Sequence, residues 1–457
     1  MKIASQHNSA VSMVKAALEK AEQFKDYNIF ISLNSEQALK KAAEIDAKIA
    51  KAEPVGRLAG VPYALKDNFL SPDGNTTAAS TILAPLQSPT PATSVAKLEA
   101  EGAIMIGRTN LDSFAHGSST ENSYFGATKN SADQTRVAGG SSGGSAVAVA
   151  LDIVQFATGS DTGGSIRQPA SFNGVYGFKP TYGAISRYGV VAMASSTDCI
   201  GYFTKNADDM DLLMQITAGQ DPKDHTTLPD FYNQSSATSN QAKIGIVKNF
   251  DSDSVHPDIR QALQNQISDL KAKGHEIVEL DLPTLKYALA AYYIIAPAEV
   301  ASNLSRHDGV RYGYRSEDAN SLDAVYQKTR DQGFMSENKR RIMIGNFVLS
   351  SGFYDAYYLK AQKVRTLIIQ EYNKAFEKCD FILTPVSPNP AFKLGEKIND
   401  PIAMYMEDIM STPINLAGLP SLAFPVASGT SKLPLGLQLI APRRHDKAIL
   451  KFVKEII

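Results

Sequence analysis

Residues 243–282 constrain the fold most, because two short apolar runs flank one long amphipathic segment. The runs KIGIVKNF and HEIVELDLP are typical of buried strands, and the intervening HPDIRQALQNQISDLKAKG has an apolar residue every three or four positions until Gly274. The apolar stripe consists of Ile259, Leu263, Ile267 and Leu270. A strand, a helix and a strand at this spacing predict a parallel βαβ unit. A long helix around 355–378 that runs into CDFILTP repeats the pattern, so the sequence predicts an α/β fold with helices covering a mostly buried sheet.

Other segments add elements of both kinds. Residues 34–52 read as a helix, which Asn34 caps together with Gln37 in a capping box. Residues 92–110 predict a helix that stops at Gly102, followed by the buried strand AIMIG. The first 24 residues predict an amphipathic helix without an apolar signal core.

Composition excludes several classes of protein. The 457 residues carry a formal net charge of −1, so no overall electrostatic attraction to nucleic acid or membrane is expected. Two cysteines in unrelated contexts, Cys199 and Cys379, provide neither a disulfide framework nor a metal cluster. No apolar run approaches the ~18 residues of a membrane span. These features favour a cytoplasmic protein.

Two serine-containing glycine loops lie in a segment, residues 130–200, that is rich in Gly and Ser yet too apolar to be a linker. The first loop, GGSSGGSA, contains G-x-S-x-G around both Ser141 and Ser142. A nucleophile elbow requires a strand directly before the serine, and DQTRVAGG has no strand signal. No Lys-Ser/Thr pair closes the glycines, so the loop is not a phosphate-binding P-loop either.

The second loop, SDTGGS, offers consecutive backbone N–H groups from Thr162 to Ser165. Donors aimed at one point beside a serine hydroxyl form an oxyanion hole. Such a serine also needs a base. His116 is the only histidine close in sequence to either loop, and Lys66, at the end of the apolar run VPYAL, is the alternative, since burial lowers the pKa of an ammonium group.

The motifs ALKDNF, GGSSGGSA and GSDTGGSIRQPA together resemble the amidase signature family. The resemblance implies an α/β/α sandwich around a large mixed β-sheet, as one domain over residues 1–457. Its parts are a helical segment of about 1–55, a Ser/Gly-rich catalytic core of about 56–205 and an α/β part of about 206–457. It further implies a Ser–cis-Ser–Lys triad and no metal. The implied roles are nucleophile for Ser165, bridging cis-serine for Ser141, general base for Lys66, and oxyanion donors for Thr162, Gly163 and Gly164.

Longer segments, among them KRRIMIG and INLAGLPSLAFP, resemble the branch of this family that releases ammonia from glutamine for tRNA-dependent amidation. By this resemblance Arg341 holds the α-carboxylate of glutamine and Asp408 its α-ammonium group, and either Tyr292 or Tyr293 lines the pocket. The chain itself needs no cofactor. Two partner subunits, B and C, complete a heterotrimer, in which a partner uses ATP and Mg²⁺ and binds most of Glu-tRNA(Gln).

One departure and three alternatives accompany this interpretation. Ser113 stands where members of the family commonly have glutamate, which alters the polar surroundings of the site or the route of ammonia. A stand-alone amidase for another small amide is the first alternative, and unpaired charges at Arg341 and Asp408 argue against a neutral substrate. A catalytically silent subunit is the second, which the complete triad disfavours. The lack of an anchoring segment disfavours a membrane lipid-amide hydrolase.

Overall fold

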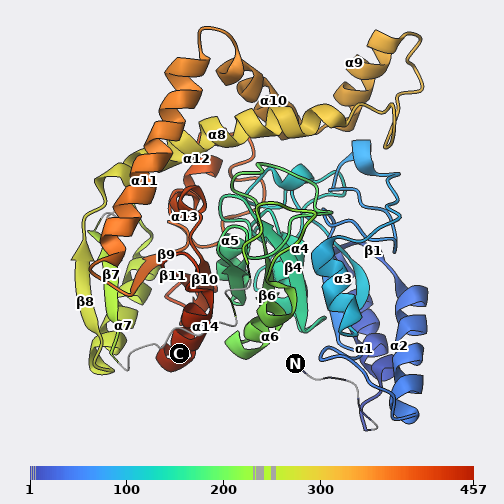
Figure 1. Ribbon diagram of the computed structural model, residues 1–457, viewed down its shortest axis with the longest axis horizontal. Coiled ribbons are helices and arrows are strands. Elements are labelled where there is room, and N and C mark those ends of the chain that lie inside the picture. Colours follow the sequence, from blue (N-terminus) through green and yellow to red (C-terminus); the bar gives the residue numbers. More distant parts are fainter. Residues whose placement is uncertain (2, 4, 6, 230–231, 233–240, 249–253) are drawn as a thin grey trace.

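The computed structural model describes residues 1, 3, 5, 7–229, 232, 241–248 and 254–457, and its centre is one mixed sheet of 11 strands. The strands are β1 (Phe30–Leu33), β2 (Pro62–Lys66), β3 (Ile104–Thr109), β4 (Phe156–Asp161), β5 (Tyr176–Lys179), β6 (Cys199–Thr204), β7 (Lys243–Val247), β8 (Glu276–Leu280), β9 (Phe381–Pro385), β10 (Ser421–Val426) and β11 (Leu435–Ile440). Their order is β1-β3-β2-β4-β6-β5-β10-β11-β9-β7-β8, with β1 at the right and β8 at the left of Figure 1. Strands from all three segments of the chain thus join a single sheet.

The strand–helix–strand unit predicted at 243–282 is confirmed. Strands β7 and β8 are parallel, with Lys243 opposite Glu276, and α7 (Pro257–Ala272) connects them. Strand β9 pairs with the other side of β7, also in parallel. The predicted strand KIGIVKNF ends at Val247 in the structure, and residues 249–250 lie outside the described residues.

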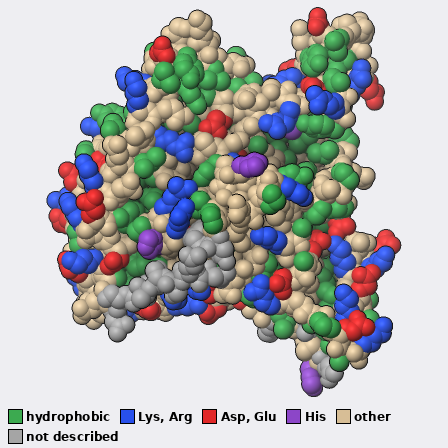
Figure 2. Space-filling model, viewed as in Figure 1, with side chains coloured by type: hydrophobic (Ala, Val, Ile, Leu, Met, Phe, Trp, Pro, Cys, Tyr) green, Lys and Arg blue, Asp and Glu red, His purple; other side chains and the backbone are tan. Residues whose placement is uncertain are grey.

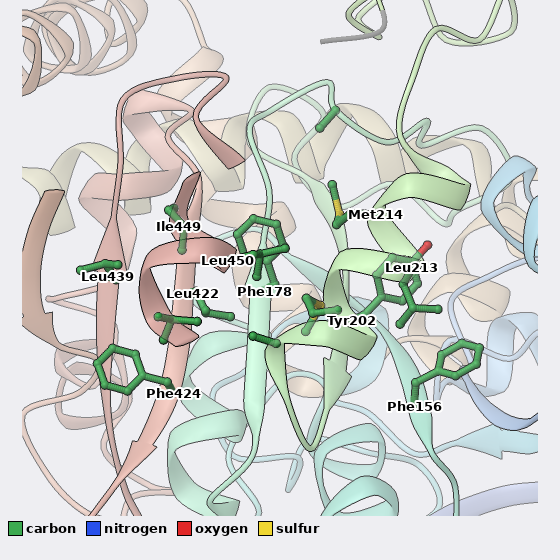
Figure 3. Close-up of a cluster of buried hydrophobic side chains, with 14 of the residues drawn as sticks. Phe156, Phe178, Tyr202, Leu213, Met214, Leu422, Phe424, Leu439, Ile449 and Leu450 are labelled. Atoms are coloured by element: carbon green, nitrogen blue, oxygen red, sulfur yellow. The ribbon is translucent and has the colours of Figure 1, made fainter. Parts of the chain in front are cut away.

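Side chains alternate between the two faces of the sheet with the period of two that strand geometry imposes. On β2, Tyr63 and Leu65 pack with α3 (Thr93–Ala100), whereas Ala64 faces α4 (Gly143–Ala150) on the opposite side. The first face is also covered by α6 (Ala207–Thr217) and α14 (Asp446–Ile456). Figure 3 shows Leu213 of α6 and Ile449 of α14 above strand residues of this face.

The opposite face is covered by α1 (Ala10–Gln23), α2 (Ser35–Ala50), α4 and α5 (Arg167–Asn173) over one half of the sheet. Over the other half lie α8 (Ala288–Asn303), α11 (Lys360–Phe376) and α13 (Thr412–Ala417). Helices on both faces of a large mixed sheet form the α/β/α sandwich that the family resemblance implies. In Figure 1, α8 crosses above the sheet and α11 descends on the left. Helix α10 (Ser336–Leu349) packs against α8.

Three local expectations are refined. The first helix begins at Ala10 rather than at the start of the chain, and residues 2, 4 and 6 lie outside the described residues. The expected capping box at Asn34 is wrong. The side-chain amide of Asn34 donates to the carbonyl of Asp73 and does not cap α2. The helix around 355–378 starts with a π-helical turn, Tyr354–Leu359. Within the described residues, no helix is both long and apolar enough to span a membrane.

Candidate active site

The topology brings Lys66 and the second serine loop together. Strands β2 and β4 are parallel neighbours, so their carboxyl ends lie at the same edge of the sheet. Strand β2 ends at Lys66 and β4 ends at Asp161, after which the chain passes through Ser165 into α5. The loop with Ser141 and Ser142 reaches the same edge immediately before α4.

The Lys66 amine is fully buried among serine hydroxyls. Its Nζ lies 2.9 Å from Ser141 Oγ, 2.7 Å from Ser142 Oγ and 2.9 Å from Ser160 Oγ. Ser142 donates its hydroxyl proton to the carbonyl of Ser160 at 3.3 Å, and Asn68 Nδ2 donates to Ser160 Oγ at 3.0 Å. Ser142 Oγ therefore accepts an N–H group of Lys66, because its own proton is engaged with the Ser160 carbonyl. For Lys66 to act as a base toward Ser141, the lone pair of its neutral amine must face Ser141 Oγ.

Burial lowers the pKa of Lys66 to about 7, against the opposing effect of the carboxylates of Asp112, Asp161 and Asp198. A lysine with an ordinary pKa is protonated near neutral pH and cannot accept a proton. At a pKa of about 7 a large share of Lys66 is the free base at neutral pH. Its position and its pKa both suit a general base.

The two serine loops are joined through their backbones. The peptide bond Gly140–Ser141 is cis, as the family resemblance implies. Gln168 Oε1 accepts a hydrogen bond from the Gly140 amide at 2.9 Å, and the Ser142 amide donates to the carbonyl of Ser165 at 3.2 Å. The Ser165 hydroxyl forms no hydrogen bond with the residues that the structure describes. Proton transfer from Ser165 to Ser141 therefore remains a prediction, whereas the contact between Ser141 and Lys66 is present.

The carboxylate of Asp161 organises the loop that carries Ser165. It accepts hydrogen bonds from the amides of Gly164 (2.9 Å) and Ile166 (3.1 Å) and pairs with the buried Arg167 guanidinium at 3.0 Å. Burial alone would raise the pKa of Asp161, but Arg167 brings it down to about 2, so the carboxylate is ionised near neutral pH. The loop is thus held around a buried ion pair.

These hydrogen bonds revise the donor set expected for the oxyanion hole. The Gly164 amide is engaged with Asp161 and is not available to a substrate in this conformation. Among the described residues, the amides of Thr162, Gly163 and Ser165 meet no acceptor. A Cβ on Gly163 would lie 2.6 Å from the Tyr292 hydroxyl, so a larger residue here would have to displace the Tyr292 ring.

Arg341 and Asp408 lie on either side of Tyr293. The Tyr293 hydroxyl donates to Asp408 Oδ2 at 2.9 Å, and the Arg341 guanidinium lies 5.3 Å from the centre of the Tyr293 ring. Tyr405 stacks on Tyr293 with ring centroids 3.9 Å apart, and Ser118 donates to Asp408 at 2.8 Å. Both tyrosines that the sequence left as alternatives therefore line the site: Tyr292 faces Gly163 and Tyr293 faces Asp408.

Arg341 keeps two nitrogens for a ligand. Its side chain is 3% exposed, and Nε donates to Glu337 Oε1 at 2.9 Å. The two terminal nitrogens form no hydrogen bond within the described part of the chain. Arg341 borders a cavity of about 190 Å³, which Ser118, His116 and Tyr405 also line. A planar guanidinium with two free donors suits bidentate recognition of a carboxylate.

Asp408 is the complementary charge. Burial raises its pKa to about 7, while hydrogen bonds from Ser118 and Tyr293 and the charge of Arg341 act in the opposite direction. A substrate ammonium group beside it would favour the ionised form and lower that pKa.

Comparison with known proteins identifies the family. The family model described as Amidase matches residues 12–450, which is nearly the whole chain. The chain belongs to the amidase family.

Several relatives of this amidase share one name. The chain is 49% identical over 454 residues to the A subunit of glutamyl-tRNA(Gln) amidotransferase from Synechococcus, covering 98% of this chain and 88% of that protein. It is 48% identical to the protein of the same name from Carboxydothermus hydrogenoformans, covering 98% and 94%. The crystal structure of the corresponding A subunit of glutamyl-tRNA(Gln) amidotransferase from Thermotoga maritima superimposes with a TM-score of 0.80 at 38% identity, covering 98% of this chain and 91% of that one.

The structure adds residues that sequence reasoning missed in this amidase. Ser142 and Ser160 share Lys66 with Ser141, and both were visible as hydroxyls beside the glycines. Asn68 follows Lys66 by two positions and had no distinguishing signal. Arg167 likewise looked like an ordinary arginine, and only the fold reveals its buried pairing with Asp161.

The structure also places the histidine nearest in sequence to the loops. His116 forms no hydrogen bond with Ser141 or Ser165; its Nδ1 lies 2.8 Å from Asn338 Nδ2. Ser113, the departure from the family pattern, donates its hydroxyl to Asn338 Oδ1 at 2.9 Å and so belongs to the same buried cluster. A neutral, hydrogen-bonded hydroxyl therefore stands at the position where the family resemblance leads us to expect a glutamate carboxylate.

Proposed function

We propose that this chain is the glutaminase subunit of a glutamyl-tRNA(Gln) amidotransferase. The observation that carries the proposal is the pairing of Arg341 and Asp408 across Tyr293, beside the loop that holds Ser165. A free amino acid presents a carboxylate and an ammonium group together, and these two side chains complement both charges. Glutamine adds the side-chain amide that the serine machinery attacks.

The contact between Lys66 and Ser141 supports the following reaction. Lys66 as free base takes the proton of Ser141, which in turn takes that of Ser165, and Ser165 Oγ attacks the glutamine δ-carbon. The amides of Thr162 and Gly163 stabilise the oxyanion. The proton returns to the leaving nitrogen, ammonia departs, and the γ-glutamyl ester on Ser165 is hydrolysed by water.

We further propose the partners and cofactors that the family resemblance implies. Two partners, the B and C subunits, complete the heterotrimer, and one of them uses ATP and Mg²⁺ to activate Glu-tRNA(Gln), which ammonia from this chain converts to Gln-tRNA(Gln). This chain needs no metal for its own half of the reaction. The whole reaction belongs to protein synthesis in the cytoplasm.

The test measures ammonia release from glutamine by the chain with its partner subunits, against a panel of neutral amides. We expect glutamine to be preferred, because a neutral amide leaves Arg341 and Asp408 unpaired. Ser165→Ala should reduce ammonia release to background. Faster turnover of neutral amides would favour a stand-alone amidase, and undiminished activity of the Ser165→Ala variant would exclude the serine mechanism.

A further inference from the structure

His116 occupies a position that the proposed mechanism does not use. Its ring is fully buried and lines the same cavity as Arg341. Nδ1 lies 2.8 Å from Asn338 Nδ2, whereas Nε2, on the opposite edge of the ring, has no hydrogen-bond partner in the described part of the chain. Buried polar atoms in folded proteins are normally hydrogen-bonded, so an unpartnered nitrogen on a ring that lines a cavity is unusual.

The hydrogen bonds of Asn338 fix which nitrogen of His116 carries the proton. Asn338 Oδ1 accepts from the backbone amide of Met335 at 3.1 Å, and a backbone amide can only donate. The orientation of the Asn338 amide group is thereby determined, and Nδ2 is the donor to the carbonyl of Ser113 and to His116. His116 Nδ1 must therefore accept, and Nε2 carries the hydrogen of a neutral imidazole.

The electrostatic surroundings agree with a neutral ring. Burial holds the pKa of His116 well below its usual range, and the positive charge of Arg341 acts in the same direction. Asn338 and Arg341 lie one turn apart on α10, so the helix that fixes the ring also carries the guanidinium. His116 and Arg341 thus line one cavity, and each carries N–H groups that have no acceptor among the described residues.

A buried donor without an acceptor is unfavourable, so a ligand that supplies the acceptor gains affinity. The acceptor must suit a site where Arg341 also donates. A carboxylate has enough lone pairs to accept from both, whereas an ammonium group has none.

We propose that His116 is a substrate-binding residue whose Nε2–H donates to the carboxylate of the amino-acid substrate, alongside Arg341. The inference rests on the proposed function and adds a specificity determinant to it. The contact selects for a substrate with a carboxylate next to the carbon that bears the ammonium group.

The kinetic experiment compares two substrates and two variants in the same preparation of the chain with its partner subunits. Glutamine is compared with 4-aminobutanamide, which has the same amide and ammonium group but no carboxylate. His116→Met removes the donor with little change in volume, and His116→Gln keeps an N–H donor. For His116→Met we expect KM for glutamine to rise about tenfold with kcat within about twofold, because a hydrogen bond to a charged group is lost.

The second substrate separates binding from packing. For 4-aminobutanamide, kcat/KM of His116→Met should match that of the unaltered chain, and His116→Gln should recover most of the affinity for glutamine. Equal losses on both substrates, or an unchanged KM for glutamine, would overturn the inference. If the unaltered chain releases no ammonia from glutamine, the proposed function fails instead, so the two failures are distinguishable.

A measurement on the native ring covers the case in which His116→Met does not fold. Ser165→Ala protein labelled with [15N]histidine is titrated with glutamine and observed by NMR. We expect the Nε2–H proton of His116 to shift downfield with glutamine and to stay in place with 4-aminobutanamide. No shift with glutamine at saturation, or the same shift with both compounds, would overturn the assignment.

Discussion

At the scale of single residues, the decisive property is the altered pKa of two buried groups, Lys66 and Asp408. Both have a pKa of about 7, the lysine lowered and the aspartate raised, in each case chiefly by burial. Lys66 must be neutral to act as a base, so its active form is populated above that pKa. Asp408 must be ionised to bind an ammonium group, so its active form is also populated above that pKa.

We therefore expect activity to increase with pH and to level off above about pH 8. In the enzyme–substrate complex the bound ammonium group lowers the pKa of Asp408, so kcat should follow a single ionisation near pH 7, that of Lys66. In contrast, kcat/KM reports the free enzyme and should fall more steeply below pH 7, because both groups lose their active form.

Measurements of steady-state ammonia release between about pH 5.5 and pH 9 check both pH profiles. Asp408→Asn is the matched control: it should raise KM strongly and leave kcat/KM with one ionisation instead of two. A kcat that is independent of pH through this range would contradict the assignment of Lys66 as the base.

Single residues also show where reasoning from the sequence is reliable. Glycine-flanked serines and a lysine after an apolar run made Ser141, Ser165 and Lys66 candidates, and the family resemblance assigned their roles. The hydrogen bond from the Gly164 amide to Asp161 was not foreseeable, because it depends on the direction in which the Asp161 carboxylate points at the end of β4. Similarly, the unpartnered nitrogen of His116 depends on Asn338, which is distant in sequence.

At the scale of elements, periodicity identified those with a strong pattern. The βαβ unit at 243–282 and the helix and strand at 92–110 are confirmed, because their apolar stripes face the sheet as predicted. The capping of α2 was wrong because Asn34 found a tertiary partner in Asp73. The crossing of α8 and α10 left no sequence signal, since the contact lies between residues that share no local pattern.

The close packing of α8 against α10 can be tested at Gly345, which lies on α10. A Cβ on Gly345 would lie 2.0 Å from the Pro297 carbonyl oxygen and 2.7 Å from Ala301 Cβ. Gly345→Ala must therefore push α10 away from α8, at a cost of about 1–3 kcal/mol in the free energy of unfolding. Arg341 lies one turn earlier on α10, so the displacement should also raise KM for glutamine.

Thermal unfolding and glutamine kinetics check this together. Met343→Ala is the control on the same helix, because that side chain is 71% exposed and its removal should change neither Tm nor KM. A Gly345→Ala protein with unaltered Tm and KM would mean that the close approach of the two helices does not position Arg341.

At the scale of the whole molecule, the site is assembled from distant parts of the chain. Lys66 ends strand β2 and Ser165 lies in the loop after β4, whereas Arg341 and Asp408 come from the second half, on and near the helices above the sheet. Only the family resemblance, not residue patterns, predicted that Arg341 and Asp408 belong together. Patterns of 3.6 and 2.0 residues specify which face of an element is buried, but they do not specify which elements converge at one edge of a sheet.

The charge of the whole chain leads to a final prediction about tRNA. Its 46 Lys and Arg residues are balanced by 47 Asp and Glu residues, and Figure 2 shows the two kinds intermingled on the face in view. Affinity for a polyanion depends on a concentrated basic surface that displaces counterions from phosphates. We therefore expect the isolated chain to bind Glu-tRNA(Gln) weakly, and the complex with its partner subunits to bind tightly.

Fluorescence anisotropy with labelled tRNA, at salt concentrations between about 50 and 200 mM, separates the two cases. The complex should lose affinity steeply as salt rises, because a partner makes the phosphate contacts, whereas the isolated chain should show little binding at any salt concentration. The chain's own glutaminase site should be dispensable for this binding, so a complex containing Ser165→Ala is the control and should bind tRNA as the unaltered complex does. Tight, salt-dependent binding by the isolated chain would mean that its basic side chains, although balanced overall, are arranged to follow a phosphate backbone.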